Sequence, residues 1–324
     1  MRAILCTQPG PPEALQLTDL PDPKPAAGEV VVDVAFAALN FFDTLIIQGK
    51  YQVKPPFPFS PSGECAGIVA EVGDGVTQFK KGDRVCGHRG YNCAREKAVF
   101  PEARLAKVPD GLPLEKAAGL FVTYGTTIHA LKDRGHIKAG DTLAILGASG
   151  GVGVAAVELG KVFGARVIAC ASSPEKLAFC KQHGADELID YSKEDLKERL
   201  KELTGGEGVD LVYDPVGGKL GEAALRALTW EGRYLVIGFA GGEITKMPLN
   251  LTLLKGCDIA GVFWGEFIRR NPSQLRTQIE ELMGWIRDGR VSAYVDKIYP
   301  FAEAVQAFER LSGRQAMGKV LLKP

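Results

Sequence analysis

The sequence predicts a two-domain α/β protein in which a partly open β-barrel is joined to a doubly wound parallel sheet. Buried strands alternate with helices between residues 142 and 264, which suits about six parallel strands. Residues 1–122 instead contain short strands punctuated by glycine turns, a pattern typical of a barrel. The segments after residue 265 resemble a return to the first domain. We therefore assign residues 1–122 and 266–324 to the barrel domain and residues 123–265 to the parallel-sheet domain.

The composition excludes several classes of partner. The chain has 324 residues, with 39 basic and 39 acidic side chains and no long run of one sign, which argues against nucleic acid or an anionic membrane. No apolar run approaches the length of a membrane span, and the chain begins with a strand pattern rather than a signal peptide. Seven dispersed cysteines without a C-x-x-C pair are typical of reduced thiols. We therefore expect a cytoplasmic protein.

The barrel domain contains predicted strands at 29–36, 64–72 and 84–86. Two irregular pieces interrupt them: the turn Asn40–Asp43 and a proline-rich loop at 54–61. Loops held by a rigid barrel often carry binding and catalytic residues, so both pieces are candidates for a site.

The parallel-sheet domain begins with a strand at 142–146, which a glycine turn connects to a helix at 154–163. A short helix from Leu114 and a longer one at 128–134 precede this strand. A second strand is predicted at 166–171. The helix after it begins at hydroxyl-bearing capping residues and ends at Gly184. Further strands are predicted near 187–191, 209–214, 233–238 and 258–264, with helices between them.

The glycine turn has the pattern Ala148-x-Gly150-x-x-Gly153, in which alanine replaces the first glycine of a dinucleotide-binding turn. Gly150 lets the backbone approach a pyrophosphate, and Gly153 lets helix and strand pack closely. Such turns are common, but the strand-helix alternation that follows favours a dinucleotide site. The predicted phosphate contacts are Gly147, Ser149, Gly150, Gly151, Val152 and Gly153.

The end of the second strand indicates which dinucleotide binds. An NAD site usually has an acidic residue there, whereas this chain has Ser172 and Ser173, with Lys176 one turn later. Two hydroxyls and a cation suit a 2'-phosphate, so NADPH is favoured. The alternative is that both serines only cap the helix and Lys176 is solvated, and Glu175 weakens the case for a phosphate.

The C-terminal part contains a helix from Asn271 and Pro272 to about residue 288. It is followed by a strand at 291–299, a helix at 301–311 and a strand at 319–322.

One loop of the barrel domain contains three potential metal ligands, Cys86, His88 and Cys93, but a structural zinc site needs four. We predict no metal.

The order of these segments resembles the medium-chain dehydrogenase/reductase superfamily over nearly the full chain. Five motifs resemble its zinc-free NADPH:quinone oxidoreductases: Asn40-x-x-Asp43, Gln48-Gly49-Lys50-Tyr51, Val122-Thr123-Tyr124-Gly125-Thr126, Tyr213-Asp214-Pro215-Val216-Gly217-Gly218 and Val262-Phe263-Trp264-Gly265. The resemblance implies a GroES-like barrel, a Rossmann domain and a homodimer formed by edge pairing of the strand at 258–264.

The resemblance also implies chemistry without zinc. The zinc-dependent alcohol dehydrogenases of the superfamily have cysteine where this chain has Asn40 and histidine where it has Gly63. Their third ligand would fall between Pro113 and Thr127, where this chain has no Cys, His or Asp. Without a Lewis acid, a conjugated acceptor is favoured over a simple ketone. The expected reaction is hydride transfer from NADPH to a quinone.

Two residues are the catalytic candidates. The resemblance implies that the Asn40 amide approaches the nicotinamide ribose or the acceptor carbonyl, and that Tyr51 donates a hydrogen bond or a proton to the acceptor. Asn40 as an ordinary turn residue and Tyr51 as a surface aromatic are the alternatives.

Further cofactor contacts follow from the same resemblance or, for three aromatic residues, from their place after strand ends, with core packing or a solvated lysine as the alternatives. They are Tyr124 and Thr127 at the nicotinamide, Tyr191 near the adenosine phosphate, Lys319 at the pyrophosphate, and Phe239, Phe263 and Trp264 after strand ends. Two other functions stay open: reduction of a 2-enoyl thioester or enone, and a non-catalytic role as an NADPH-binding sensor or structural protein.

Overall fold

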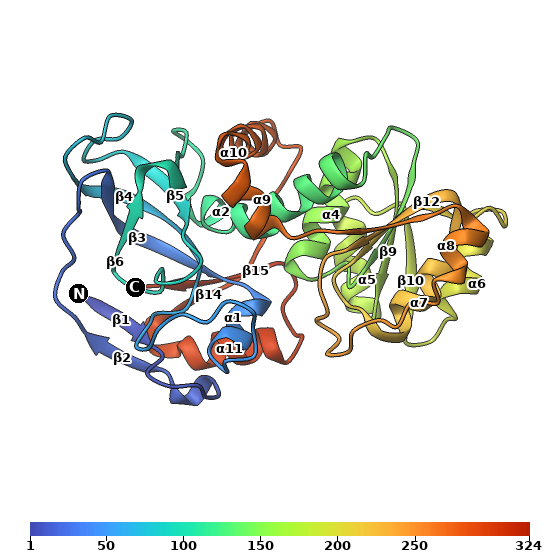
Figure 1. The fold of residues 1–324 in the computed structure, drawn as a ribbon, viewed down its shortest axis with the longest axis horizontal. Helices are drawn as coiled ribbons and strands as arrows, with labels where there is room; N and C mark the ends of the chain where they lie inside the picture. The colour runs from blue at the N-terminus through green and yellow to red at the C-terminus, as the bar shows by residue number, and fades with distance from the viewer. The chain divides into compact units, whose positions relative to one another are not determined.

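The computed structural model describes residues 1–324 and divides into two compact units (Figure 1). Unit 1 comprises Met1–Thr123, Asn271–Gly289 and Ala293–Pro324, and unit 2 comprises Tyr124–Arg270 and Arg290–Ser292.

The predicted boundary after residue 265 falls inside helix α9 (Trp264–Arg270). In this helix the Glu266 carboxylate pairs with Arg269 and Arg270, three and four residues further on. These pairs and the helical hydrogen bonds keep the segment together. The whole helix lies in unit 2, and so does Arg290–Ser292, which the sequence also assigned to the barrel domain.

Unit 1 is built on a seven-stranded, mostly antiparallel sheet in the order β14-β15-β3-β4-β5-β7, in which β6 also pairs with β3. A separate hairpin of β1 and β2 completes its strands. The bounds are β1 (Arg2–Leu5), β2 (Gln16–Asp19), β3 (Glu29–Leu39), β4 (Glu64–Val72), β5 (Arg84–His88), β6 (Lys97–Pro101), β7 (Leu105–Lys107), β14 (Val295–Pro300) and β15 (Lys319–Lys323).

Strand register in unit 1 brings distant parts of the sequence together. The blue strand β3 and the red strand β15 pair antiparallel, with Leu39 opposite Val320 (Figure 1). On the other side of β3, Ala38 lies opposite Glu64, the first residue of β4. The end of β3 therefore meets the starts of β4 and β15 at one place.

The helices of unit 1 are α1 (Phe41–Ile46), α2 (Leu114–Ala118), α10 (Pro272–Arg287) and α11 (Ala304–Ser312), with 3-10 turns at Pro12–Ala14, Glu102–Arg104 and Phe301–Glu303. The sequence predicts only a turn at Asn40–Asp43, but helix α1 begins there. The Asn40 backbone N–H donates to the Asp43 carboxylate at 2.8 Å, which stabilises the helix start. Local hydrogen bonding thus extends the turn into a helix.

Unit 2 contains the predicted six-stranded parallel sheet, in the order β10-β9-β8-β11-β12-β13. This order, with the first strand in the middle, is that of a doubly wound dinucleotide-binding sheet. The bounds are β8 (Thr142–Leu146), β9 (Arg166–Ala171), β10 (Glu187–Asp190), β11 (Val209–Asp214), β12 (Leu228–Val236) and β13 (Asp258–Gly261). The last strand is shorter than its predicted range because helix α9 begins at Trp264.

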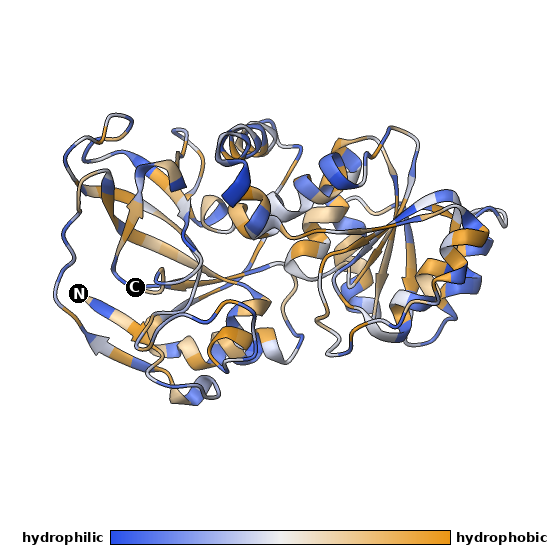
Figure 2. Cartoon of the chain, in the orientation of Figure 1, coloured by the Kyte–Doolittle hydropathy of each residue, from blue (hydrophilic) through white to orange (hydrophobic).

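The other helices of unit 2 are α3 (Gly125–Ile128), α4 (Gly151–Val162), α5 (Pro174–Gln182), α6 (Leu196–Leu203), α7 (Gly218–Arg226) and α8 (Asn250–Lys255). A π-helical segment, His129–Arg134, follows α3, and another, Leu120–Tyr124, precedes α3 and ends at the first residue of unit 2. In both units the sheet strands are largely hydrophobic (Figure 2), and each unit has its own buried cluster of apolar side chains. None of the helices has both the length and the apolar character needed to cross a membrane.

Candidate active site

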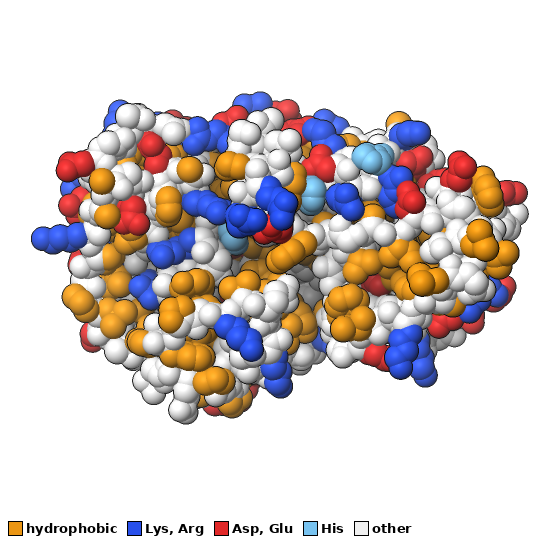
Figure 3. Space-filling model, viewed as in Figure 1, with side chains coloured by type: hydrophobic (Ala, Val, Ile, Leu, Met, Phe, Trp, Pro, Cys, Tyr) orange, Lys and Arg blue, Asp and Glu red, His pale blue; other side chains and the backbone are white.

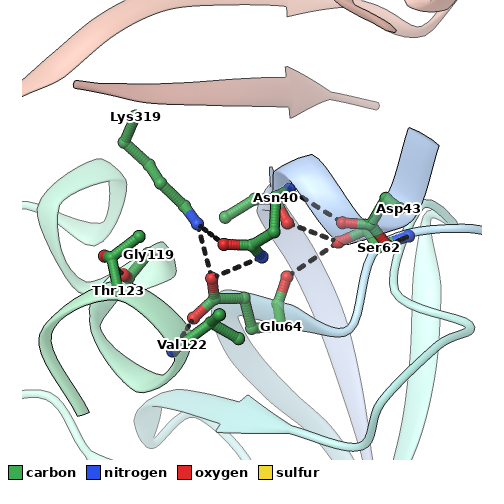
Figure 4. A network of polar contacts seen from close by, with 9 residues as sticks. Asn40, Asp43, Ser62, Glu64, Gly119, Val122, Thr123 and Lys319 are labelled. Atoms are coloured by element: carbon green, nitrogen blue, oxygen red, sulfur yellow. Dashed lines mark hydrogen bonds and ion pairs between the residues drawn. The ribbon is translucent and has the colours of Figure 1, made fainter. Parts of the chain in front are cut away.

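A buried polar network in unit 1 joins Asn40, Glu64 and Lys319 (Figure 4). The Lys319 ammonium donates to Glu64 Oε1 at 2.7 Å and also to Asn40 Oδ1. Asn40 Nδ2 donates to the same Glu64 oxygen at 2.9 Å. The three residues meet because each lies at a strand end near the β3–β4 and β3–β15 pairings.

The network fixes the orientation of the Asn40 amide. Its oxygen accepts from Lys319, and one of its two N–H groups donates to Glu64. An asparagine amide has two N–H donors, so one remains for a ligand. Asn40 is thus prepared to act as a hydrogen-bond donor rather than an acceptor.

Glu64 is a site residue that the sequence reasoning missed. Its side chain is fully buried, and Oε2 accepts from the backbone N–H of Val122 at 2.9 Å. A buried carboxylate is stable only when it is paired and hydrogen-bonded, and Lys319, Asn40 and Val122 provide both. The available signal was an acidic residue opening a strand that is otherwise largely apolar.

Lys319 was predicted to contact the cofactor pyrophosphate. In unit 1 its side chain is only 6% exposed, and its ammonium is bonded to Glu64 and Asn40. The aliphatic part lies on Gly119, where an added Cβ would come within 2.7 Å of Lys319 Cγ and Cε. A side chain at position 119 would displace the lysine, so Gly119 is a second residue that sequence reasoning missed.

Asp43 contacts this network through the backbone of Asn40. Its carboxylate accepts from the backbone N–H groups of Asn40 at 2.8 Å and Ser62 at 3.1 Å. Burial raises the pKa of Asp43 to about 7, although these two hydrogen bonds and the Lys319 charge act in the opposite direction. The charge beside Asn40 therefore changes near neutral pH.

Tyr51, the other catalytic candidate, is half-buried and stacks on Phe42, with ring centroids 5.5 Å apart. Its hydroxyl makes no hydrogen bond to another residue of the chain and so remains able to donate to a ligand. Burial, and then the negative charge of Asp43, raise the pKa of Tyr51 above its ordinary value. The phenol therefore stays protonated at neutral pH.

In unit 2 the glycine turn is closely packed at Gly153 and open at Gly150. A Cβ on Gly153 would lie 2.3 Å from the Gly147 carbonyl oxygen, so this turn packs directly on the first turn of α4. Gly147 has a left-handed φ of 57°. Gly150, by contrast, is open, and no side chain caps the helix that follows it. The amides at the start of α4 are thus available to an anion.

Four predicted cofactor residues lie together at the ends of β9 and β10. Lys176 Nζ donates to Ser172 Oγ at 3.4 Å, while Ser173 Oγ accepts from the Lys176 backbone N–H at 3.3 Å. The Tyr191 backbone N–H donates to Ala171 O at 3.1 Å, which places Tyr191 beside the end of β9. Ser173 therefore caps helix α5, and the Lys176 ammonium and the Ser172 hydroxyl lie beside this cap.

Three further predicted residues are buried in unit 2. The Thr127 and Tyr213 hydroxyls are 2.9 Å apart, and the Trp264 indole lies against Gly125, where a Cβ would be 3.0 Å from the ring. The Tyr124 hydroxyl donates to Glu158 at 2.8 Å. Thr127 and Trp264 thus lie near the ends of β11 and β13, the edge of the sheet where ligands bind.

The two predicted phenylalanines are more exposed. Phe239 lies shortly after the end of β12, where its ring edge closely approaches Gly217. Phe263 is 54% exposed and precedes α9. Both follow strand ends, as the sequence predicts, and their role in binding a cofactor stays a prediction.

No group of three or more His, Cys, Asp or Glu side chains lies in a position to hold a metal ion. Cys86 and Cys93 are buried, and all seven cysteines are free thiols. Desolvation, with a smaller effect of the Arg104 and Lys319 charges, lowers the pKa of His88 to about 3, so this imidazole is neutral.

Comparison with known proteins agrees with this architecture. Residues 26–130 match the family model of the alcohol dehydrogenase GroES-like domain, and residues 151–285 match that of the zinc-binding dehydrogenases. Quinone oxidoreductase-like protein 2 of Rattus norvegicus is 37% identical over 323 residues, which cover 99% of this chain and 91% of the relative. Quinone oxidoreductase of Pseudomonas aeruginosa is 35% identical over 97% of both chains.

The crystal structure of Escherichia coli quinone oxidoreductase complexed with NADPH matches with a TM-score of 0.94, at 31% identity and over 100% of both chains. The fold and these relatives define a medium-chain dehydrogenase/reductase, as predicted. Within that superfamily, the chain belongs to the quinone oxidoreductase family.

Proposed function

We propose that the protein is an NADPH-dependent oxidoreductase that reduces a conjugated carbonyl compound, with a quinone as the favoured acceptor. The family relationship supports the reaction class, and the relative from Escherichia coli was crystallised with NADPH. The observation that carries the proposal is the Asn40 amide, which Glu64 and Lys319 hold with one N–H free for a ligand.

In this proposal the Asn40 N–H donates to the acceptor oxygen while negative charge develops there. A fixed donor in a buried site stabilises such charge without having to reorient during the reaction. Tyr51 is the second donor, since its hydroxyl is uncommitted and stays protonated at neutral pH. Lys319 and Glu64 hold the Asn40 amide in place.

The residues of unit 2 fit NADPH. The start of α4 presents uncapped amides beside the open Gly150, which suits the pyrophosphate. Ser172 and Lys176 suit the 2'-phosphate, and no acidic residue occupies the end of β9 to bind a 2'-hydroxyl. When bound, NADPH supplies the hydride.

We propose that the reaction proceeds without zinc. The resemblance implies that Asn40 and Gly63 stand where the alcohol dehydrogenases have two zinc ligands, and no three potential ligand side chains converge in this structure. Without a Lewis acid, an acceptor that delocalises charge by conjugation is favoured. Quinones meet this requirement, and so do enones and 2-enoyl thioesters.

The test is NADPH oxidation with matched quinones, enones and 2-enoyl thioesters, with and without a chelator. Quinone turnover that is unaffected by the chelator is expected. Turnover with thioesters alone would assign the enzyme to that acceptor instead. NADPH binding without turnover of any acceptor would favour a sensor or structural role, and loss of activity with the chelator would contradict the zinc-free proposal.

Substitution of Asn40 tests the site itself. Asn40→Ala is expected to lower kcat by about 100-fold, the usual effect of removing a donor to a developing oxyanion. Gln274→Ala changes an exposed amide side chain of α10 and serves as the matched control. Full kcat in Asn40→Ala with a good acceptor would show that Asn40 has no catalytic role.

We further propose that two copies of the chain form a homodimer through unit 2. Strand β13 is an edge strand, and exposed apolar side chains lie at and near α8, where Figure 3 shows hydrophobic atoms at the surface. They include Trp230, Ile244, Leu249, Leu253 and Leu254, of which Leu253 is 81% exposed. Such a patch next to an open strand edge suits a second copy.

Sedimentation of Leu253→Asp against the unchanged protein tests this assembly, because a charge in an apolar interface should produce monomers. An unchanged protein that sediments as a monomer would contradict the dimer.

The free thiols support a reducing compartment, and we propose the cytoplasm.

A further inference from the structure

Another buried carboxylate, Glu158, lies in the middle of helix α4 and is only 5% exposed. Its oxygens contact donors from three separate segments of unit 2. Oε2 accepts from the Tyr124 hydroxyl at 2.8 Å and from the Ser292 N–H at 3.2 Å. Oε1 accepts from the Ser292 hydroxyl and lies 2.8 Å from His183 Nδ1.

Two of these donors lie at the two ends of unit 2. Tyr124 is the first residue of unit 2 and Ser292 is the last, so one carboxylate binds both ends of the unit. His183 follows helix α5 and packs on Phe179, with ring centroids 4.4 Å apart. A carboxylate that makes four such contacts has a fixed position and fixes the groups that it binds.

Tyr124 begins the short segment 124–127, which reaches the ligand edge of the sheet. At its other end the Thr127 hydroxyl contacts Tyr213 at the end of β11 and approaches Val152 O at the glycine turn, at 3.5 Å. Between them Gly125 lies against Trp264. The hydrogen bond from Tyr124 to Glu158 therefore anchors one end of a segment whose other end lies beside the predicted cofactor site.

We propose that Glu158 is a positioning residue for the nicotinamide half of the cofactor, acting through the Tyr124 hydroxyl. It holds the Tyr124–Thr127 segment at the distance from α4 that ring binding requires. The adenosine half is expected to be independent of the Tyr124 bond, because Ser172, Ser173 and Lys176 lie at the end of β9 and the start of α5 rather than on the Tyr124–Thr127 segment. This inference rests on the proposed binding of NADPH.

The test compares two ligands by fluorescence titration: NADPH, and adenosine 2',5'-bisphosphate, which lacks the nicotinamide. Tyr124→Phe removes only the hydroxyl, and Glu158→Gln keeps the size of the side chain. Each is expected to weaken NADPH binding by about tenfold, equivalent to one hydrogen bond to a charged group, while binding of the bisphosphate is unchanged. Glu207→Gln, which changes an exposed glutamate of unit 2, is the matched control.

The double variant shows whether Glu158 acts through Tyr124. If it does, Tyr124→Phe adds little to the effect of Glu158→Gln on the NADPH dissociation constant. Unchanged NADPH affinity in both single variants, with only a lower melting temperature, would overturn the inference and leave a structural role. Equal weakening of both ligands would overturn it too.

Failure of this inference differs from failure of the proposed function. In the first case the unchanged protein binds NADPH and the variants bind it equally well. In the second case the unchanged protein does not bind NADPH at all. If Glu158→Gln does not fold, Tyr124→Phe alone decides the question, since it removes one hydroxyl from a ring that stays buried.

Discussion

Lys319 donates a hydrogen bond to Asn40 from 279 residues further along the chain, and it also pairs with the buried carboxylate of Glu64. The ammonium thus neutralises the acid and holds the Asn40 amide by its oxygen. Both effects depend on one side chain, so its replacement has consequences for stability and for activity.

Lys319→Met is expected to destabilise the protein by about 3–5 kcal/mol, because it leaves Glu64 buried without a counter-charge. Denaturant unfolding monitored by fluorescence measures this change. The double variant Lys319→Met/Glu64→Gln is expected to recover much of the loss, since it buries no unpaired charge. A double variant that is less stable than Lys319→Met would contradict the pairing.

Gly119→Ala tests the packing under Lys319. The new methyl group would come within 2.7 Å of the lysine side chain and displace it, which should lower both stability and kcat. Gly284→Ala in helix α10 is the matched control, because nothing lies within 4 Å of its added Cβ and alanine favours the helix by roughly 0.5–1 kcal/mol. Equal behaviour of the two variants in thermal unfolding would contradict the proposed contact.

The glycine turn predicts opposite results for two neighbouring alanine substitutions. Gly153→Ala would place a Cβ 2.3 Å from the Gly147 oxygen, so we expect a distorted turn and a lower melting temperature. At Gly150 the nearest atom would be 3.5 Å away, so Gly150→Ala should fold normally but bind NADPH more weakly. Scanning calorimetry measures the melting temperature of each variant, and titration measures its affinity for NADPH. A Gly153→Ala variant with an unchanged melting temperature and normal NADPH binding would contradict the close contact between positions 153 and 147.

Asp43 predicts a pH-dependent stability. Its pKa is raised from 3.8 in the unfolded chain to about 7 by burial, so the folded state binds the proton more tightly. The resulting stabilisation is fully present below the unfolded pKa and is lost as the pH rises through about 7.

The check is thermal unfolding of the unchanged protein and Asp43→Asn at about pH 5 and about pH 8. Asparagine does not titrate, so the stability of the unchanged protein relative to the variant should fall between these two values. A constant difference would mean that the hydrogen bonds from Asn40 and Ser62 keep Asp43 ionised at both pH values.

Lys176→Ala is expected to reduce the preference for NADPH over NADH by about tenfold, as loss of one charged contact to a phosphate would. The ratio of kcat/KM for the two cofactors measures it. Lys197→Ala, which changes a lysine of α6, is the control. An unchanged ratio in Lys176→Ala would show that Lys176 is only a solvated neighbour of the serine cap.

Local patterns of the sequence determined the secondary structure of unit 2 well. Strands β8 and β9 have the predicted bounds, and the Ser173 cap begins α5 as expected, because apolar periodicity and helix caps depend only on neighbouring residues. The family was also evident from the sequence, since its motifs follow one another along the whole chain. The doubly wound fold follows from the strand-helix alternation.

The tertiary structure alone decided how the candidate site is assembled. Gly119 and Glu158 had no local pattern that marked them as site residues, and the only local signal for Glu64 was its acidic side chain at the start of a largely apolar strand, because the roles of all three depend on partners far away in the sequence. Glu64 meets Lys319 only through the strand register of the sheet in unit 1. Burial then decides the rest: a carboxylate removed from water must find a cation or several donors, and only the folded chain shows which ones it finds.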